Sequence, residues 1–151
     1  MNIKQMLDEI KTQKKLTRNK IKVGILKDEI IEFLEKRDIE IYTKEIYLNH
    51  KGLSHLARES KNKRGAGLSE EDILKIPEIL EMPSGIYFDN EKKKLNLLYC
   101  KYNNYEKIIK LVIDTKYKRK KEAMTLIKTA GYVEFANLVV YEKIYGNMES
   151  R

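Results

Sequence analysis

The sequence predicts an α+β domain with helices first and an antiparallel sheet second. Three observations lead to this class. Apolar residues recur at helical spacing near the start of the chain, β-branched and aromatic runs dominate residues 86–133, and short turns separate those runs. Helices that precede the strands, instead of alternating with them, are typical of an α+β domain. We therefore expect N-terminal helices packed on a C-terminal antiparallel β-meander of about four to five strands, with a C-terminal helix.

The chain of 151 residues has the length of a single domain. We expect three parts within it: a helical lead-in over residues 1–38, a core over residues 39–133, and a C-terminal helix and tail over residues 134–151.

Two helices are expected in the lead-in. Over residues 2–16 an apolar stripe recurs at the spacing of one helix face: Ile3, Met6, Leu7 and Ile10. Residues 22–26 read as a short strand. Asp28 then opens a second helix to about Arg37, whose expected apolar face is Ile30, Ile31, Phe33 and Leu34.

The middle of the chain begins with a β-branched and aromatic run over residues 39–48, which predicts one long strand or a bent pair. The next helix carries His55 and turns Leu53 and Leu56 inward. A further helix begins after Ser69, which is a typical N-cap residue, and runs to about Leu80. Pro77 lacks a backbone donor, so we expect this helix to break or restart there.

The sheet is expected from strands over residues 86–89, 95–102, 107–114 and 124–133. In the third of these, Ile109 and Leu111 face one way and Lys110 faces the other. The connection over residues 115–122 is long and basic. Residues 134–145 are expected to form the C-terminal helix.

The charge balance is strongly basic, with 31 Lys and Arg against 23 Asp and Glu and a net charge of +8. Such an excess favours phosphates and anionic surfaces, but it also arises from a generally lysine-rich composition, and both explanations stay open. Two basic clusters in predicted loops are candidate nucleic-acid contacts. They are Lys61, Lys63 and Arg64, and Lys118, Arg119, Lys120 and Lys121.

Several classes are excluded by what the sequence lacks. Cys100 is the only cysteine and there are two histidines, so no intrachain disulfide and no zinc-type ligand set is visible. Walker, dinucleotide-binding, HExxH and nucleophile-elbow patterns are also missing. The N-terminus reads as neither a signal peptide nor a membrane span. We therefore expect a cytoplasmic protein without metal, cofactor or membrane contact.

Four residues are candidates for chemistry. His55 is of the type that serves as acid or base near neutral pH, and Arg58, one turn on, is of the type that holds a phosphate. Lys110 alternates with apolar residues in a strand, and Thr129 lies near a strand end beside Ala130-Gly131. Each also has a plain structural reading as a surface or strand residue. His50 reads as a loop or capping residue.

Three segments resemble phage-associated members of the barnase–EndoU–colicin–RelE nuclease superfold. They are EIYLNHKGLSHLARES, EEDILKIPEILEMPSGIYFDN and IIKLVIDTKYKRKKEAMTLIKTAGYV, within about residues 40–133. The matching features are His55-Leu56 with Arg58, the Ile76-to-Leu80 segment with Pro83, Lys110 in its strand, and Thr129-Ala130. The sequence departs from the pattern at Glu59-Ser60-Lys61, where such domains usually carry a second basic residue.

The resemblance implies metal-independent RNA cleavage by transesterification. In that scheme His55 is the acid or base, Arg58 and Lys110 stabilise charge, and Thr129 positions the phosphate. An immunity or phage protein is a possible partner. Two other interpretations stay open: a non-catalytic basic protein that binds nucleic acid or a partner on the same scaffold, and a purely structural phage protein.

Overall fold

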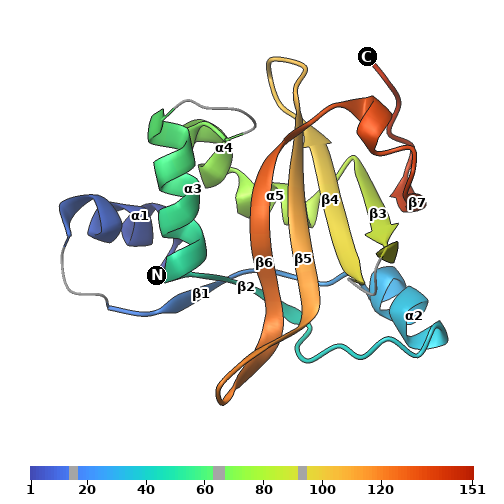
Figure 1. The fold of residues 1–151 in the computed structure, drawn as a ribbon, viewed down its shortest axis with the longest axis horizontal. Coiled ribbons are helices and arrows are strands. Elements are labelled where there is room, and N and C mark those ends of the chain that lie inside the picture. Colours follow the sequence, from blue (N-terminus) through green and yellow to red (C-terminus); the bar gives the residue numbers. More distant parts are fainter. Residues whose placement is uncertain (14–16, 63–66, 92–94) are drawn as a thin grey trace.

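The structure, a computed structural model, describes residues 1–13, 17–62, 67–91 and 95–151. Within these residues, seven strands form one sheet in the order β1-β2-β6-β5-β4-β3-β7 (Figure 1). All neighbouring strands are antiparallel except β2 and β6. The strands are β1 (Lys20–Ile25), β2 (Glu45–Asn49), β3 (Gly85–Asp89), β4 (Asn96–Tyr102), β5 (Ile108–Arg119), β6 (Glu122–Val133) and β7 (Glu142–Gly146).

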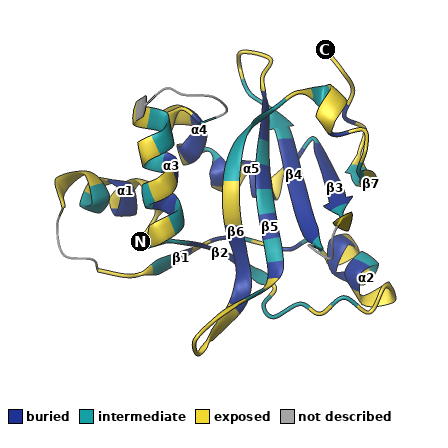
Figure 2. Cartoon of the chain, viewed as in Figure 1, coloured by how far each residue is buried: buried dark blue, intermediate teal, exposed yellow. Residues whose placement is uncertain are grey.

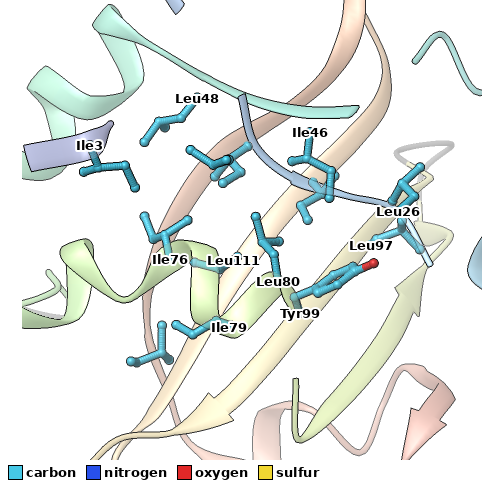
Figure 3. Packing of buried hydrophobic residues seen from close by; sticks show 14 of the residues in the cluster. Ile3, Leu26, Ile46, Leu48, Ile76, Ile79, Leu80, Leu97, Tyr99 and Leu111 are labelled. Carbon is cyan, nitrogen blue, oxygen red and sulfur yellow. The ribbon is translucent and has the colours of Figure 1, made fainter. Parts of the chain in front are cut away.

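The α-helices of the described residues all pack on one face of this sheet. Each contributes buried apolar side chains to a single core cluster with the inward residues of β2 to β6, part of which is drawn in Figure 3. None of them is long and apolar enough to cross a membrane. The helices are α1 (Ile3–Thr12), α2 (Asp28–Lys36), α3 (His50–Asn62), α4 (Glu70–Leu74) and α5 (Ile76–Glu81).

The local signals for the helices are confirmed. Ile3, Met6 and Leu7 of α1 are buried. Ser69 caps α4, since its side chain accepts a hydrogen bond from the Asp72 backbone N–H at 3.2 Å. The predicted break falls at Lys75, and Pro77 lies in the first turn of α5, where a missing N–H costs little.

The expected C-terminal helix over residues 134–145 is wrong. This segment holds a single 3-10 turn, Phe135–Asn137, and then β7, which pairs with the free edge of β3. The apolar residues Leu138 and Met148 are buried on the second face of the sheet, whereas Val140 is 70% exposed. An extended segment both covers that face with apolar side chains and pairs with the free edge of β3. A helix at this position would leave that edge unpaired.

The expected count of four to five strands is also wrong, because β1, β2 and β7 join the sheet. In addition, β5 and β6 run through the predicted basic loop and leave only Lys120 and Lys121 as the turn, with Lys120 at φ 55°. We call the outer part of this hairpin, residues 116–123, the β5–β6 ribbon. Most of its side chains are exposed, so the sequence there lacks the apolar alternation that predicts strands. Of the run over residues 39–48, only the part from Glu45 onward is strand.

Tyr99 offers a test of the core. Its ring lies between Leu97 and Leu80 (Figure 3), it is fully buried, and its hydroxyl has no hydrogen-bond partner. Burial raises its pKa, because the ionised form would lose its solvation. We expect Tyr99→Phe to raise the free energy of unfolding by about 1 kcal/mol, since it removes an unsatisfied polar group without changing the ring.

Denaturant unfolding at neutral pH measures this change. Tyr105→Phe is the matched control, because Tyr105 is 74% exposed and its hydroxyl faces water. A clear loss of stability in Tyr99→Phe would contradict the expectation.

Candidate functional site

The two faces of the sheet differ in what covers them. Along β5, Ile109 and Leu111 point to the helices, while Ile108, Lys110 and Val112 point to the second face. Over β3 and β4 the second face is covered by the C-terminal segment. Ile108 of β5 is buried with this segment, whereas Lys110, Val112, Lys128 and Thr129 of β5 and β6 are half-buried or exposed (Figure 2). We call the part that these four residues form the open face.

Lys110 and Thr129 share the open face. Lys110 pairs with Gly131, and Val112 pairs with Thr129 on the neighbouring strand. Lys110 and Thr129 are therefore diagonal neighbours across β5 and β6, a separation that a long side chain spans. Lys110 is half-buried and Thr129 is exposed.

A β-bulge adds a further cation at this position. Val112 pairs with Thr129 and Ile113 pairs with Ile127, so Lys128 is the extra residue of β6. Its side chain is exposed. Bulges redirect side chains and occur frequently beside active sites. Sequence reasoning missed Lys128, although one signal was present: the order in, out, out, in from Ile127 to Ala130 breaks the alternation of a regular strand.

Helix α3 flanks the exposed stretch of β6 because β2 ends early. β2 pairs with β6 through Ile46–Thr125 and Tyr47–Leu126 only, and α3 begins at His50 (Figure 1). Two hydrogen bonds hold β6 in place where it pairs with β2. The buried Thr125 donates its hydroxyl to the Thr43 carbonyl at 2.5 Å, and its N–H donates to the Thr43 hydroxyl at 2.9 Å.

The side of α3 that faces β6 is marked by Gly52. A Cβ atom at this position would lie 3.0 Å from the Asn49 side-chain oxygen and 3.9 Å from the Ile127 carbonyl oxygen. At 3.6 residues per turn, His55 lies within about 60° of Gly52 around the helix, whereas Arg58 lies about 120° away from it. His55 is therefore an exposed residue on the helix that packs against β6 near Ile127.

Arg58 lies elsewhere on α3. It lines a cleft of about 1000 Å³ that is formed by α1, α3 and α4, together with Leu7, Lys61 and Glu70 among others. The structure therefore groups Lys110 with Thr129, places His55 on the adjoining helix side, and turns Arg58 toward α1.

The described residues of the two predicted basic clusters lie on different elements. Lys61 is exposed at the end of α3, while Lys63 and Arg64 lie outside the described residues. The other cluster is exposed at the tip of the β5–β6 ribbon: Lys118, Arg119, Lys120 and Lys121.

A polar network around the buried Asp72 holds the C-terminal end of β6. Tyr132 donates its hydroxyl to the Asp72 carboxylate at 2.5 Å and accepts the Ser69 N–H at 3.2 Å. Asn103 donates to the same carboxylate at 2.9 Å. Burial, and then the bond to Asp72, raise the pKa of Tyr132. The network joins α4, the β4–β5 turn and β6, so it fixes the strand that carries Thr129.

Cys100 pairs across β4 and β5 with Lys110 but is fully buried. Burial raises the pKa of its thiol to about 12, which the nearby Lys110 only partly offsets. The thiol is therefore protonated at neutral pH and is no nucleophile. Among the described residues, no group of three or more His, Cys, Asp or Glu side chains is placed to hold a metal ion.

Comparison with protein families gives one match, over residues 20–129, to the family described as phage-Barnase-EndoU-ColicinE5/D-RelE like nuclease 3. The chain belongs to this family. The match spans β1 to Thr129 of β6, and so includes His55, Lys110 and Lys128. No curated protein and no solved structure matches the chain significantly. The predicted resemblance is confirmed, and this phage nuclease-like domain has α1 before the matched region and the C-terminal segment after it.

The contact between α3 and β6 can be tested through Gly52. We expect Gly52→Val to lower the free energy of unfolding by about 1–3 kcal/mol, because its branched side chain would press on Asn49 and Leu48. Lys51→Val is the matched control, since Lys51 is exposed on the same helix turn and receives the same branched side chain. Helix propensity alone would favour Gly52→Val over Lys51→Val, because Gly is the poorer helix former. Thermal unfolding measures both. Equal losses in the two variants would contradict the close packing of α3 on this side.

Proposed function

We propose that this protein is a phage or mobile-element endoribonuclease that cleaves RNA by metal-independent transesterification on the open face. Its membership of a phage nuclease-like family supports a nuclease function. The observation that carries the assignment of the site is the placement of Lys110 and Thr129 as neighbours on an uncovered sheet face beside the helix of His55.

The reaction needs proton transfer at two oxygens. A base removes the proton of the ribose 2′-hydroxyl, the 2′-oxygen attacks phosphorus, and the 5′-oxygen leaves with a proton from an acid. The products are a 2′,3′-cyclic phosphate and a 5′-hydroxyl. His55 is of the residue type that exchanges protons near neutral pH, so we assign it as the acid or base.

Negative charge develops on the non-bridging phosphate oxygens during the attack. Lys110 supplies a cation on a rigid central strand, and Thr129 supplies a hydroxyl donor one diagonal step away. Lys128 adds a second cation from the bulge. In this proposal Lys128 takes the charge-stabilising role that the resemblance gave to Arg58, because Arg58 lines the cleft next to α1.

A second candidate function is nucleic-acid binding without cleavage. The exposed cations at the tip of the β5–β6 ribbon favour it, since they would attract phosphates whether or not the open face is reactive. Product analysis separates the two functions.

We expect the purified protein to cleave single-stranded RNA equally with and without EDTA, and His55→Ala to lower kcat by about 10²–10⁴-fold, the usual contribution of a general acid or base. A dinucleotide substrate and detection of the cyclic phosphate measure this. Lys36→Ala, an exposed lysine on α2, controls for changes in net charge. Identical rates for wild type and His55→Ala would refute the assignment of His55.

Lys128 and Arg58 can be compared directly. Both are exposed cations, so truncation to Ala costs little folding energy. We expect Lys128→Ala to lower kcat/KM by about 10²-fold, in the range of lost transition-state electrostatics, and Arg58→Ala to lower it far less. A larger loss in Arg58→Ala would show that the cation beside α1 reaches the phosphate.

A further inference from the structure

A second cleft lies where the β5–β6 ribbon meets the start of α3. It has a volume of about 360 Å³ and is formed by segments far apart in the sequence. Asn19 comes from the residues before β1. Asn49, His50 and Lys51 come from the end of β2 and the start of α3, and the other lining residues come from the β5–β6 ribbon. The complete lining is Asn19, Asn49, His50, Lys51, Tyr117, Arg119, Lys120 and Glu122. We call it the ribbon cleft.

The charge of the ribbon cleft is positive. Lys51, Arg119 and Lys120 contribute three positive charges and Glu122 one negative charge, which leaves two positive charges with His50 neutral. The Glu122 carboxylate accepts a hydrogen bond from the Asn19 side-chain amide at 3.3 Å. Among the residues that the structure describes, Glu122 forms no salt bridge with the cations of the cleft. The three cations therefore keep their charge available for an anion.

The walls of the ribbon cleft are tied together. The His50 backbone N–H donates to the Asn19 carbonyl at 2.7 Å, and Lys20 pairs with Asn49 in the β1–β2 ladder. With the bond from Asn19 to Glu122, these contacts join the start of β1, the start of α3 and the ribbon. The cations are thus held around one space from two elements, unlike a row of lysines on a solvated strand.

We infer that the ribbon cleft binds a backbone phosphate of the same RNA strand that is cut on the open face. This inference rests on the proposed function, which supplies the RNA. Lys and Arg side chains are the common partners of phosphate oxygens, and the imidazole of His50 adds a further donor. A site that binds the phosphate holds the backbone and does not read the base sequence.

The position of the ribbon cleft fits a single continuous strand. His50 and His55 lie on the same helix, separated by about 7.5 Å along its axis at about 1.5 Å per residue. β6 likewise runs from Glu122 at the cleft to Thr129 on the open face. Seven residues of strand rise roughly 23 Å at about 3.3 Å per residue, so a phosphate in the cleft and the reactive phosphate would be several nucleotides apart along an extended RNA, and a dinucleotide would be too short to engage both sites.

The test compares two lysines of the same ribbon. Lys120 lines the ribbon cleft, whereas Lys118 points to the other side of β5 from Tyr117 and Arg119. The probe is a ten-nucleotide oligouridine with 2′-O-methyl groups, which lacks the attacking hydroxyl and reports binding alone. We expect Lys120→Gln to weaken its binding about fivefold or more and to lower the salt slope by about 1, as for one lost phosphate contact. The loss in Lys118→Gln is expected to be several-fold smaller.

Glu122→Gln provides a variant of opposite sign. It keeps a group that accepts from Asn19 but removes the negative charge of the cleft, so we expect tighter binding of the ten-nucleotide probe. A merely damaged fold would not tighten it. The 2′-O-methyl dinucleotide should bind the wild type much more weakly than the ten-nucleotide probe does, because it does not span both sites.

The outcomes separate this inference from the proposed function. Equal losses in Lys118→Gln and Lys120→Gln, or no gain in Glu122→Gln, would overturn the ribbon cleft and indicate diffuse electrostatic attraction, even if RNA is cleaved. If unmodified RNA is not cleaved but Lys120→Gln and Glu122→Gln shift binding in opposite directions, the cleft stands as a phosphate site and the catalytic proposal falls.

Discussion

The arrangement of this protein depends on the short parallel pairing between β2 and β6. Only Ile46 and Tyr47 pair with β6, and the buried bonds of Thr125 to Thr43 fix the strand at that point. The chain then turns into α3, whose Gly52 allows the helix to approach β6 closely. A longer parallel pairing would put a strand, and its regular alternation, beside Lys128 and Thr129. The early end of β2 instead lets the chain turn into α3, the helix that carries His55.

The second face of the sheet has an apolar part over β3 and β4 and a polar part over β5 and β6. Leu138 and Met148 cover β3 and β4, and the segment that carries them is held by two bonds from Arg37 to Glu142, both 2.7 Å. Over β5 and β6 the bulge at Lys128 prevents a comparable apolar cover, because it turns two successive polar side chains outward. The open face is therefore the part of the sheet that its own sequence makes unsuitable for burial.

Sequence reasoning recovered the features that local physical chemistry determines. The stripe of α1, the Ser69 cap, the restart at Pro77 and the alternation around Lys110 are set by residues close in the chain. It failed where the structure of a segment is determined by contacts with residues far away in the sequence. β7 exists because the edge of β3 is free, and the ribbon continues through charged residues because backbone pairing requires no apolar pattern. His55, Lys110 and Thr129 were candidates from their residue types and positions and received roles from a family resemblance, whereas Lys128 required the register of two strands.

The family match helps to explain why the proposed site lies where it does. Residues 20–129 include the early end of β2, the start of α3 and the bulge, which together define the open face. The parts outside the match pack on different sides: α1 buries Met6 and Leu7 against the helical layer, and the C-terminal segment buries Leu138 on the opposite face. Neither α1 nor the C-terminal segment pairs with the stretch of β6 from Lys128 to Thr129. These additions therefore enlarge the core on both sides of the matched domain while leaving uncovered the strip on which we propose that RNA is cut.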